Sequence, residues 1–434
     1  MDADLKTGQP RPLLLGALLL AAFAARAAFA WLHPGTYDVD RYVSLALSVL
    51  ERGEYGLVPG QPSITAAPLF PLWIAGLYSV FGRHPFAILL ANAALSTATA
   101  ALLCLLGRRL FSRRAGLLAL ALWAGYPYAV YYCAWSQRES LLVFLACAML
   151  WLLLRLFEDR TAAWAAASGA VGGLLGLSNP TCLIFVGLVP LGMLLQARRE
   201  GLARLLAAYY LCLGLCYSPW VLRNQLAFGR PILTNVHGGI NLYQGMMLKA
   251  EDFGTERETE YLRTDPVERE GQRLCNEGRE FEANALYQKA GREAILAAPG
   301  RYAARCLERF LKFWRPVPYR RAYPFSYAKV FWASLLSDGL LLPLGLGGLL
   351  LWRRRWQEFL PLLAMVLLWP LSYYLVYAVV RFRMPVMPVF VLFAAALLDQ
   401  GWRVSSRSME PACRAQTGAE SQDRGSAAGP GPSR

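Results

Sequence analysis

Charged residues are scarce in this sequence. Asp, Glu, Lys and Arg make up 17% of its 434 residues, whereas 56% of the residues are hydrophobic and the mean hydropathy is positive. A soluble globular chain of this length normally carries more charge and less apolar material. The composition therefore excludes an ordinary soluble protein and predicts an all-α polytopic membrane protein that has the lipid bilayer as its surroundings.

Acidic residues are fewer than basic residues, 29 against 44, which gives a formal net charge of +15. In a soluble protein such an excess can indicate a nucleic-acid partner. Here the basic residues fall mostly in short clusters between apolar runs, the pattern that the positive-inside rule explains for a membrane protein. We therefore expect no nucleic-acid partner.

Motifs for metal binding and redox chemistry are also missing. The nine cysteines show no zinc-ligand spacing and no redox pair. Several of them lie inside apolar runs, where a cysteine is usually a small buried hydrophobe. The first apolar run is not followed directly by a small-residue cleavage site, so we expect a retained membrane anchor rather than a cleaved signal.

Long apolar runs dominate what is present. A helix needs about 20 mostly apolar residues to cross the hydrocarbon core of a bilayer, and the chain divides into about ten such segments. The expected segments are 12–32, 85–106, 115–133, 139–157, 162–177, 181–195, 205–222, 331–352, 359–379 and 384–398. The run 69–81 is too short to span, and we expect either a helix that lies near the interface or an oblique extension of the second span.

Arginine clusters predict the orientation of these segments. Nearly all dense clusters fall on one side if the N-terminus is cytoplasmic, and the C-terminus is then cytoplasmic too. The outer face consists of residues 38–69, the turn before Glu139, and residues 223–327. Arg381 and Arg383 lie in the last short outer loop and break the positive-inside pattern, which makes them candidates for function.

The same reading divides the chain into four parts. We expect an N-terminal transmembrane module over 1–222, whose first outer loop is 33–84, and an outer region over 223–327 with amphipathic helices at 280–296 and 302–313. C-terminal transmembrane helices follow over 328–402. The polar tail 403–434 is rich in Ser, Gly and Pro, and we expect it to be a disordered cytoplasmic segment.

The segment Tyr37-Asp38-Val39-Asp40-Arg41-Tyr42 places acidic residues directly after the first apolar run. The layout puts Asp38 and Asp40 at the water boundary above an apolar bundle. A carboxylate there can act as a general base toward a hydroxyl or an amine. The structural alternative is a solvated turn in which an aspartate caps a helix N-terminus. The sequence leaves both interpretations open.

Short motifs along most of the chain carry a family resemblance. They are Asp38 with Arg41-Tyr42, Arg52-Gly53-Glu54-Tyr55-Gly56, Pro68-Leu69-Phe70-Pro71-Leu72, Phe81-Gly82, Trp135-Ser136-Gln137-Arg138-Glu139, Ser218-Pro219-Trp220-Val221-Leu222-Arg223-Asn224 and Arg381-Phe382-Arg383-Met384-Pro385. In order and topological side this set resembles the GT-C glycosyltransferases. It is most similar to the dolichyl-phosphate-mannose protein mannosyltransferase and aminoarabinose lipid A transferase branch, which is glycosyltransferase family 39-like.

The resemblance implies a GT-C-like bundle of about ten transmembrane helices. It also implies transfer of a sugar from a polyprenyl-phosphate donor to a glycolipid, polysaccharide or protein acceptor, on the extracytoplasmic face of the plasma (inner) membrane. In such enzymes an acidic residue of the first loop lies at the reaction centre. Asp38 occupies the matching position, Asp40 is the alternative carboxylate, and Glu139 matches a second acidic position. The structural alternative for Glu139 is a favourable charge in the first turn of a helix.

The leaving group of this reaction is a phosphate, so cations must meet it. Guanidinium groups suit phosphate because they bind two oxygens at once and keep their charge. The candidates by topology are Arg41, Arg223, Arg381 and Arg383. The alternative for each is snorkelling to lipid headgroups or pairing with a local acid.

The chain departs from the aminoarabinose transferase pattern at Ala67-Pro68-Leu69, where those proteins carry a lysine before the proline. The departure removes one phosphate contact and disfavours a lipid A substrate.

A transporter or flippase of polyprenyl-linked saccharide is the competing hypothesis. Such a protein would also need arginines and aromatic residues, but it is expected to carry ionisable residues inside its spans. The spans here are almost free of them away from their ends, which favours the enzyme. We expect no firmly held cofactor, although an acidic site leaves room for a weakly bound divalent cation.

Overall fold

The computed structural model describes residues 12–35, 38, 40–196, 200–235, 237–253, 255–320 and 327–404. Within these residues the chain is helical apart from loops and one isolated bridge between Val58 and Gln61. The expected all-α class is therefore confirmed. The expected tail 403–434 lies outside the described residues from 405 onward, as does Tyr37 of the acidic loop.

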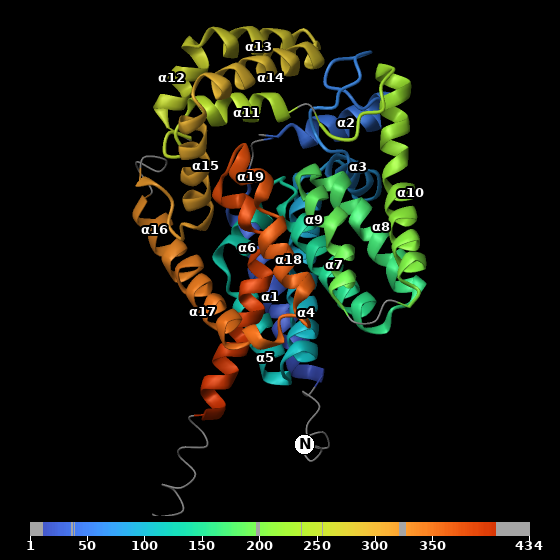
Figure 1. Cartoon of the computed structure of the whole chain (residues 1–434), viewed down its shortest axis with the longest axis vertical. Coiled ribbons are helices and arrows are strands. Elements are labelled where there is room, and N and C mark those ends of the chain that lie inside the picture. Colours follow the sequence, from blue (N-terminus) through green and yellow to red (C-terminus); the bar gives the residue numbers. More distant parts are fainter. Residues whose placement is uncertain are drawn as a thin grey trace, which may run out of the picture.

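Apolar helices form a bundle whose long axis is vertical in Figure 1. The helices long and apolar enough to cross a bilayer are α1 (Pro12–Leu32), α4 (Pro85–Leu110), α7 (Glu139–Asp159), α10 (Leu202–Phe228), the segment Ala328–Leu351 made of α16 (Tyr327–Leu336) and α17 (Asp338–Leu351), and the helix Met387–Val404. The bent pair α5 (Arg113–Ala124) and α6 (Pro127–Tyr131) can form a seventh span. The chain is thus a multi-pass membrane protein.

The remaining expected segments are helical but shorter than a full span. They are α8 (Ala162–Ser178), the segment Pro180–Leu195 with α9 (Leu183–Leu188) between short 3-10 turns, and the pair α18 (Leu360–Leu368) and α19 (Leu371–Leu375). Prolines at the breaks account for part of this, because Pro180 and Pro370 cannot donate a backbone hydrogen bond to the preceding turn. Helices are therefore present in all ten expected segments, but in the part of the chain that the structure describes six of them, or seven with the bent pair, have the length of a span.

The bend between α5 and α6 is fixed by a buried arginine. Tyr126 is extended because Pro127 follows it, so α5 ends and leaves carbonyl groups without partners. Arg26 of α1 donates to the carbonyl oxygens of Trp123 at 2.8 Å and Ala124 at 3.1 Å, and to the hydroxyl of Ser96 at 2.8 Å. A cation at a helix C-terminus is favourable. This ionisable residue inside a span therefore holds the bundle together.

The first loop contributes two helices at one end of the bundle. These are α2 (Tyr42–Arg52), which ends at Gly53 with φ +68°, and α3 (Leu69–Phe81), which is as short as the sequence predicts. Tyr42 and Phe70 pack edge to face across the two helices, with ring centroids 5.2 Å apart. The contact ties the start of α2, next to the acidic loop, to the bundle.

A layer of more polar helices covers the same end, at the top of Figure 1. It consists of α11 (Gly238–Met247), α12 (Glu256–Thr264), α13 (Pro266–Asn276) and α14 (Glu280–Ala297), and we call these four helices the polar layer. The helix α15 (Pro299–Trp314) connects the layer back toward the bundle. The polar layer has its own small core of Tyr243, Leu274, Ala283 and Tyr287. The amphipathic helices expected at 280–296 and 302–313 correspond to α14 and α15.

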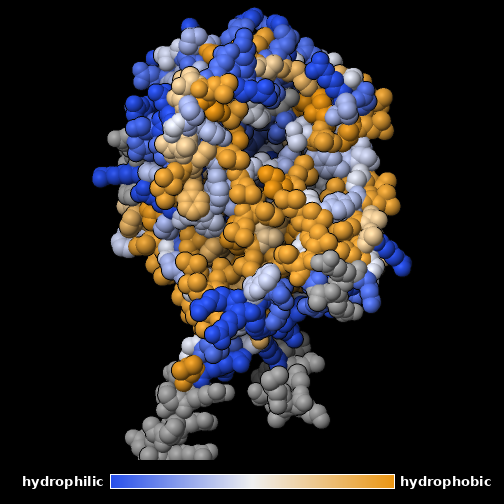
Figure 2. Space-filling view, viewed as in Figure 1, coloured by the Kyte–Doolittle hydropathy of each residue, from blue (hydrophilic) through white to orange (hydrophobic). Residues whose placement is uncertain are grey.

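Hydropathy follows this arrangement over the visible surface. Figure 2 shows an apolar belt around the middle of the molecule, with hydrophilic residues above it on the polar layer and below it at the other end. The belt matches what a bilayer requires of the spanning helices. The described ends of the chain, at the start of α1 and at Val404, both lie at the end of the bundle away from the polar layer (Figure 1).

Candidate active site

Three segments far apart in the sequence meet between the bundle and the polar layer. Asp40 comes from the loop before α2, Glu139 is the first residue of α7, and Arg381 lies in the 3-10 turn η6 (Val380–Arg383). The Nη1 atom of Arg381 is 3.1 Å from Oδ2 of Asp40, and its Nη2 atom is 3.5 Å from Oδ1. Its Nε atom is 3.8 Å from Oε1 of Glu139. One guanidinium therefore links two carboxylates.

Arg381 is held in place by aromatic residues of its own region. Its guanidinium lies 5.4 Å from the ring of Phe382, which stacks on Tyr373 at 4.5 Å. Burial alone would lower the pKa of Arg381, but the neighbouring Glu139 and Asp40 carboxylates outweigh it and raise that pKa above its ordinary value. The guanidinium therefore stays charged at every physiological pH.

Glu139 is an incompletely satisfied buried carboxylate. The residue is 4% exposed, and Oε2 has no hydrogen-bond partner among the described residues. The N-terminus of α7 favours a negative charge at this position. A buried acceptor without a partner costs free energy, and in a native fold it often marks a place for water or a ligand. Glu139 thus combines a structural role with unused binding capacity.

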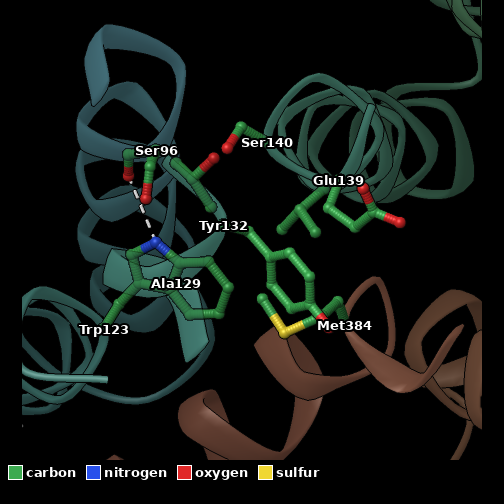
Figure 3. A pocket seen from close by; sticks show the side chains of 9 residues that line it. Ser96, Trp123, Ala129, Tyr132, Glu139, Ser140 and Met384 are labelled. Atoms are coloured by element: carbon green, nitrogen blue, oxygen red, sulfur yellow. Dashed lines mark hydrogen bonds between the residues drawn. The ribbon is translucent and has the colours of Figure 1, made fainter. Parts of the chain in front are cut away.

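A small pocket lies on the bundle side of Glu139 (Figure 3). Its lining comes from α4, α5, α6, the 3-10 turn η1 (Tyr132–Ala134), α7 and Met384, which follows η6 and precedes the last span. The lining residues are Ser96, Thr99, Trp123, Ala129, Tyr132, Glu139, Ser140, Val143 and Met384. Figure 3 shows the ring of Tyr132 beside Met384, and the carboxylate of Glu139 directed away from Ser96 and Trp123. The carboxylate therefore faces away from the pocket interior, and its Oε1 atom meets Arg381.

The sequence interpretation missed a second cation, Arg138. It precedes Glu139 and is half-buried, and its Nη1 atom donates to the carbonyl oxygen of Ser178 at 3.1 Å. Burial opposes its charge, but the neighbouring Tyr42 and Glu139 favour it, and the pKa of Arg138 is raised. The signal was present, since Arg138 belongs to the motif that ends in Glu139.

Asp38 has a different environment from Asp40. Its carboxylate accepts hydrogen bonds from the backbone N–H groups of Val43 at 3.1 Å and Ser44 at 2.8 Å, and from the Ser44 hydroxyl at 2.8 Å. These contacts cap the N-terminus of α2. The structural alternative named for this loop is therefore realised at Asp38, whereas Asp40 lies against Arg381.

Arg41, which directly follows Asp40 and precedes α2, has an unusual backbone conformation. This residue has φ +57°, a left-handed conformation that is uncommon for a side chain other than glycine, asparagine or aspartate. Its backbone N–H donates to the carbonyl oxygen of Asp38 at 3.0 Å, and its side chain is exposed. The Arg41 guanidinium has no contact with Asp40 or Arg381 in the structure.

The other two expected arginines are engaged by the protein itself. Arg223 of α10 donates to the carbonyl oxygens of Tyr55 at 2.7 Å and Ser63 at 3.0 Å, and so clamps the first loop. Arg383 is 1% exposed and pairs with Asp338 of α17. Of the four arginines named from the sequence, only Arg381 meets the Asp40 and Glu139 carboxylates.

Among the described residues, no group of three or more His, Cys, Asp or Glu side chains is arranged to hold a metal ion. Both Asp40 and Glu139 are turned toward the same guanidinium. The cluster therefore consists of the carboxylates of Asp40 and Glu139 and the guanidinium groups of Arg381 and Arg138.

One family model matches part of the chain. Residues 65–222 match the family model of the dolichyl-phosphate-mannose-protein mannosyltransferases. Among curated proteins no sequence matches this chain.

Solved structures extend the likeness to nearly the whole chain. The archaeal oligosaccharyltransferase AglB from Archaeoglobus fulgidus, in complex with an inhibitory peptide and a dolichol-phosphate, matches 93% of this chain at 16% identity with a TM-score of 0.51. A second structure of the Archaeoglobus fulgidus oligosaccharyltransferase, with Zn and sulfate, matches 88% of the chain at 16% identity and a TM-score of 0.51. This chain covers 52% and 48% of those proteins, so it spans about half of their length.

The structure of ArnT from Cupriavidus metallidurans bound to undecaprenyl phosphate is 15% identical in sequence, with a TM-score of 0.42. The match covers 89% of this chain and 76% of the ArnT chain. The family model and the oligosaccharyltransferase fold together confirm the expected resemblance to the GT-C superfamily.

Proposed function

We propose that this chain is an integral membrane glycosyltransferase that moves a sugar from a polyprenyl-phosphate donor to a hydroxyl or amine of a glycolipid, polysaccharide or protein. The observation that carries the proposal is the cluster of Asp40, Arg381 and Glu139, because it joins a solvent-accessible carboxylate to a permanent cation at one end of the bundle. The family match over residues 65–222 supports the same activity. AglB, whose solved structure holds a dolichol-phosphate, supports a lipid-phosphate donor.

The reaction can be written with this chain's residues. The acceptor oxygen or nitrogen attacks the anomeric carbon and forms the new glycosidic bond, while the bond from that carbon to the phosphate oxygen breaks. The bonding electron pair leaves with the lipid phosphate. Asp40 accepts the proton that the acceptor loses. One negative charge thus moves from Asp40 to the phosphate, which changes from a diester monoanion to a monoester dianion.

Arginines stabilise the charge that develops on the phosphate. Arg381 presents a fork of two terminal nitrogens, which fits two phosphate oxygens. Arg138 supplies a second positive charge close by. Cations held in advance at the position of the leaving group lower the barrier without reorganising during the reaction.

The contacts favour Asp40 over Asp38 as the base. The Asp38 carboxylate is engaged by three hydrogen bonds that begin α2, so proton transfer to it would weaken the helix cap. Asp40 is part-exposed, and among the described residues its hydrogen bonds go to one side chain, that of Arg381. Asp38 then acts as the residue that fixes the loop, and Asp40 performs the chemistry.

The proposal includes an extracytoplasmic active site and cytoplasmic termini. Arg109 near the end of α4 pairs with Glu158 near the end of α7, so the arginine-rich ends of these helices lie together, one helix length from Glu139. The positive-inside rule assigns that end to the cytoplasm. We place the protein in the plasma (inner) membrane, with domain limits at 222, 327 and 402 and the polar layer on the extracytoplasmic side.

The competing transporter hypothesis requires ionisable residues along a path through the spans. Arg26 is such a residue in α1, but its hydrogen bonds go to the carbonyl oxygens of Ala22, Trp123 and Ala124 and to Ser96. Its role is therefore to join helices, and the enzyme remains the better interpretation.

A comparison of cells with and without the gene tests this function. Mass spectrometry of envelope glycolipids, polysaccharides and glycoproteins should show one class that loses a single sugar in the mutant. The free polyprenyl-linked sugar should accumulate. Complementation with Asp40→Asn should fail to restore the sugar although the protein reaches the membrane. An unchanged envelope in the mutant would contradict the proposal.

A further inference from the structure

The ion pair between Arg381 and Asp40 occupies the two groups that the proposed reaction needs separately. We infer that Arg381 exchanges partners during the reaction: the donor phosphate takes the guanidinium from Asp40, and Glu139 is the positioning residue that keeps Arg381 in the site during the exchange. This inference rests on the proposed function and adds an order to it. The donor must bind before Asp40 can accept a proton from the acceptor.

The geometry of the pair shows why phosphate and Asp40 compete. The two terminal nitrogens of Arg381 face the two carboxylate oxygens of Asp40, at 3.1 and 3.5 Å. The same fork is the part of an arginine that binds two oxygens of a phosphate. Because the fork faces one partner at a time, a phosphate bound there displaces the Asp40 carboxylate.

Arg381 has a separate contact that can persist. Its Nε atom, on the side of the fork away from Asp40, lies 3.8 Å from Oε1 of Glu139. Glu139 is 4% exposed and is the first residue of a long buried helix, so it cannot follow the guanidinium far. The negative charge of Glu139 offsets the positive charge of Arg381 when the Asp40 carboxylate moves away from the guanidinium. This lowers the free-energy cost of the state in which Arg381 has left Asp40 and has not yet bound the phosphate.

Asp40 can leave without disturbing the loop. Among the described residues its carboxylate forms hydrogen bonds with Arg381 alone, and Tyr42, His237 and Tyr377 lie close enough to interact with it electrostatically. The neighbouring Asp38 instead caps α2 with three hydrogen bonds. The loop is therefore fixed by Asp38 and by the turn at Arg41, and the Asp40 side chain can rotate toward an acceptor. The division of labour between two aspartates two residues apart permits the exchange.

Binding of undecaprenyl phosphate, which has the proposed leaving group but no sugar, tests the exchange. Titration into purified protein in mixed micelles, followed by tryptophan fluorescence, gives the dissociation constant. We expect Asp40→Asn to bind about three- to tenfold more tightly than wild type, because the phosphate no longer displaces a carboxylate from Arg381. A catalytic base without this pairing would show no such gain.

Asp38→Asn is the matched control. It removes the same charge two residues away, and asparagine still caps a helix, so affinity should stay near that of wild type. In an Arg381→Ala background, Asp40→Asn should lose its effect, and Glu139→Gln should weaken binding when Arg381 is present. This coupling distinguishes an exchanged partner from a general change in folding.

The outcomes separate the two claims. If wild type binds undecaprenyl phosphate but Asp40→Asn binds no more tightly, or if Asp38→Asn gains equally, the exchange is wrong and the proposed function stands. If wild type does not bind the lipid phosphate and Arg381→Ala changes nothing, the proposed function fails, and the exchange fails with it.

Discussion

Gly245 of α11 packs directly against the backbone carbonyl oxygen of Val376, so closely that a β-carbon on Gly245 would lie 1.9 Å from that oxygen. Arg309 of α15 donates to the Gly245 carbonyl oxygen at 2.6 Å and reinforces the contact. The contact joins the polar layer to the segment that leads into η6, and therefore to Arg381. The position of Arg381 in the cluster with Asp40 and Glu139 therefore depends on how the polar layer packs on this segment.

Gly245→Ala should displace this segment. We expect a loss of about 1–3 kcal/mol in the free energy of unfolding, because overpacking forces a backbone shift. Affinity for undecaprenyl phosphate should fall as Arg381 moves. Gly238→Ala is the control, since a β-carbon there meets nothing within 4 Å. Thermal unfolding and lipid titration of both variants measure the effect, and equal stability of the two would contradict the close packing.

Arg383 should behave as a structural residue, unlike Arg381. It is buried with Asp338, and Tyr126 donates to the same carboxylate at 2.5 Å. Arg383→Ala leaves Asp338 buried without its cation, which typically costs about 3–5 kcal/mol. We expect a large fall in melting temperature. Arg381→Ala should instead keep most of the stability and lose lipid-phosphate binding. A large loss of stability in Arg381→Ala together with a loss of lipid-phosphate binding only in Arg383→Ala would contradict this assignment.

Lys312 of α15 should make stability depend on alkaline pH. Burial lowers the pKa of Lys312 from its ordinary value of 10.5 to about 8, and Glu258 and Asp252 offset part of this shift. The unfolded chain therefore binds a proton that the folded chain releases between these two values. In that interval the contribution of Lys312 to the free energy of unfolding rises with pH.

Lys312→Met is the variant that isolates this group. The Nζ atom of Lys312 donates to the carbonyl oxygen of Ala250 at 2.6 Å, so the variant removes a hydrogen bond as well as the titration. The difference in melting temperature between wild type and variant should grow in favour of wild type from about pH 8 to pH 10. A difference that stays constant over this range would show that Lys312 keeps its ordinary titration in the fold.

The sequence predicts the helices well where hydrophobic length decides the outcome. The expected limits of the first segment, 12–32, are those of α1, and α7 begins at Glu139 as expected. It predicts spans less well around Asn179-Pro180, where an apolar run is interrupted and the helices stay short. An apolar run predicts burial, but it does not distinguish burial in lipid from burial in protein. The packing of the helices decides which of them crosses the whole bilayer.

The cluster itself could be predicted only in part. Topology brings Asp40, Glu139 and Arg381 to one end, but it also brings Arg223 and Arg383 there, and their donors are engaged by carbonyl oxygens and by Asp338. No periodicity separates these cases. The two aspartates of one loop differ in their contacts, since Asp38 caps α2 and Asp40 pairs with Arg381. Such contacts follow from the tertiary structure rather than from residue type.

Transfer by the purified protein tests the central claim most directly. Polyprenyl-phosphate sugars extracted from the membranes of the source cells serve as donor, membrane glycans of the gene-deleted strain serve as acceptor, and release of polyprenyl phosphate is measured by mass spectrometry. Wild type and Asp38→Asn should release it at comparable rates. Asp40→Asn should be slower by at least about 100-fold, the usual contribution of a general base. Full activity of Asp40→Asn, in protein that folds normally, would contradict the account.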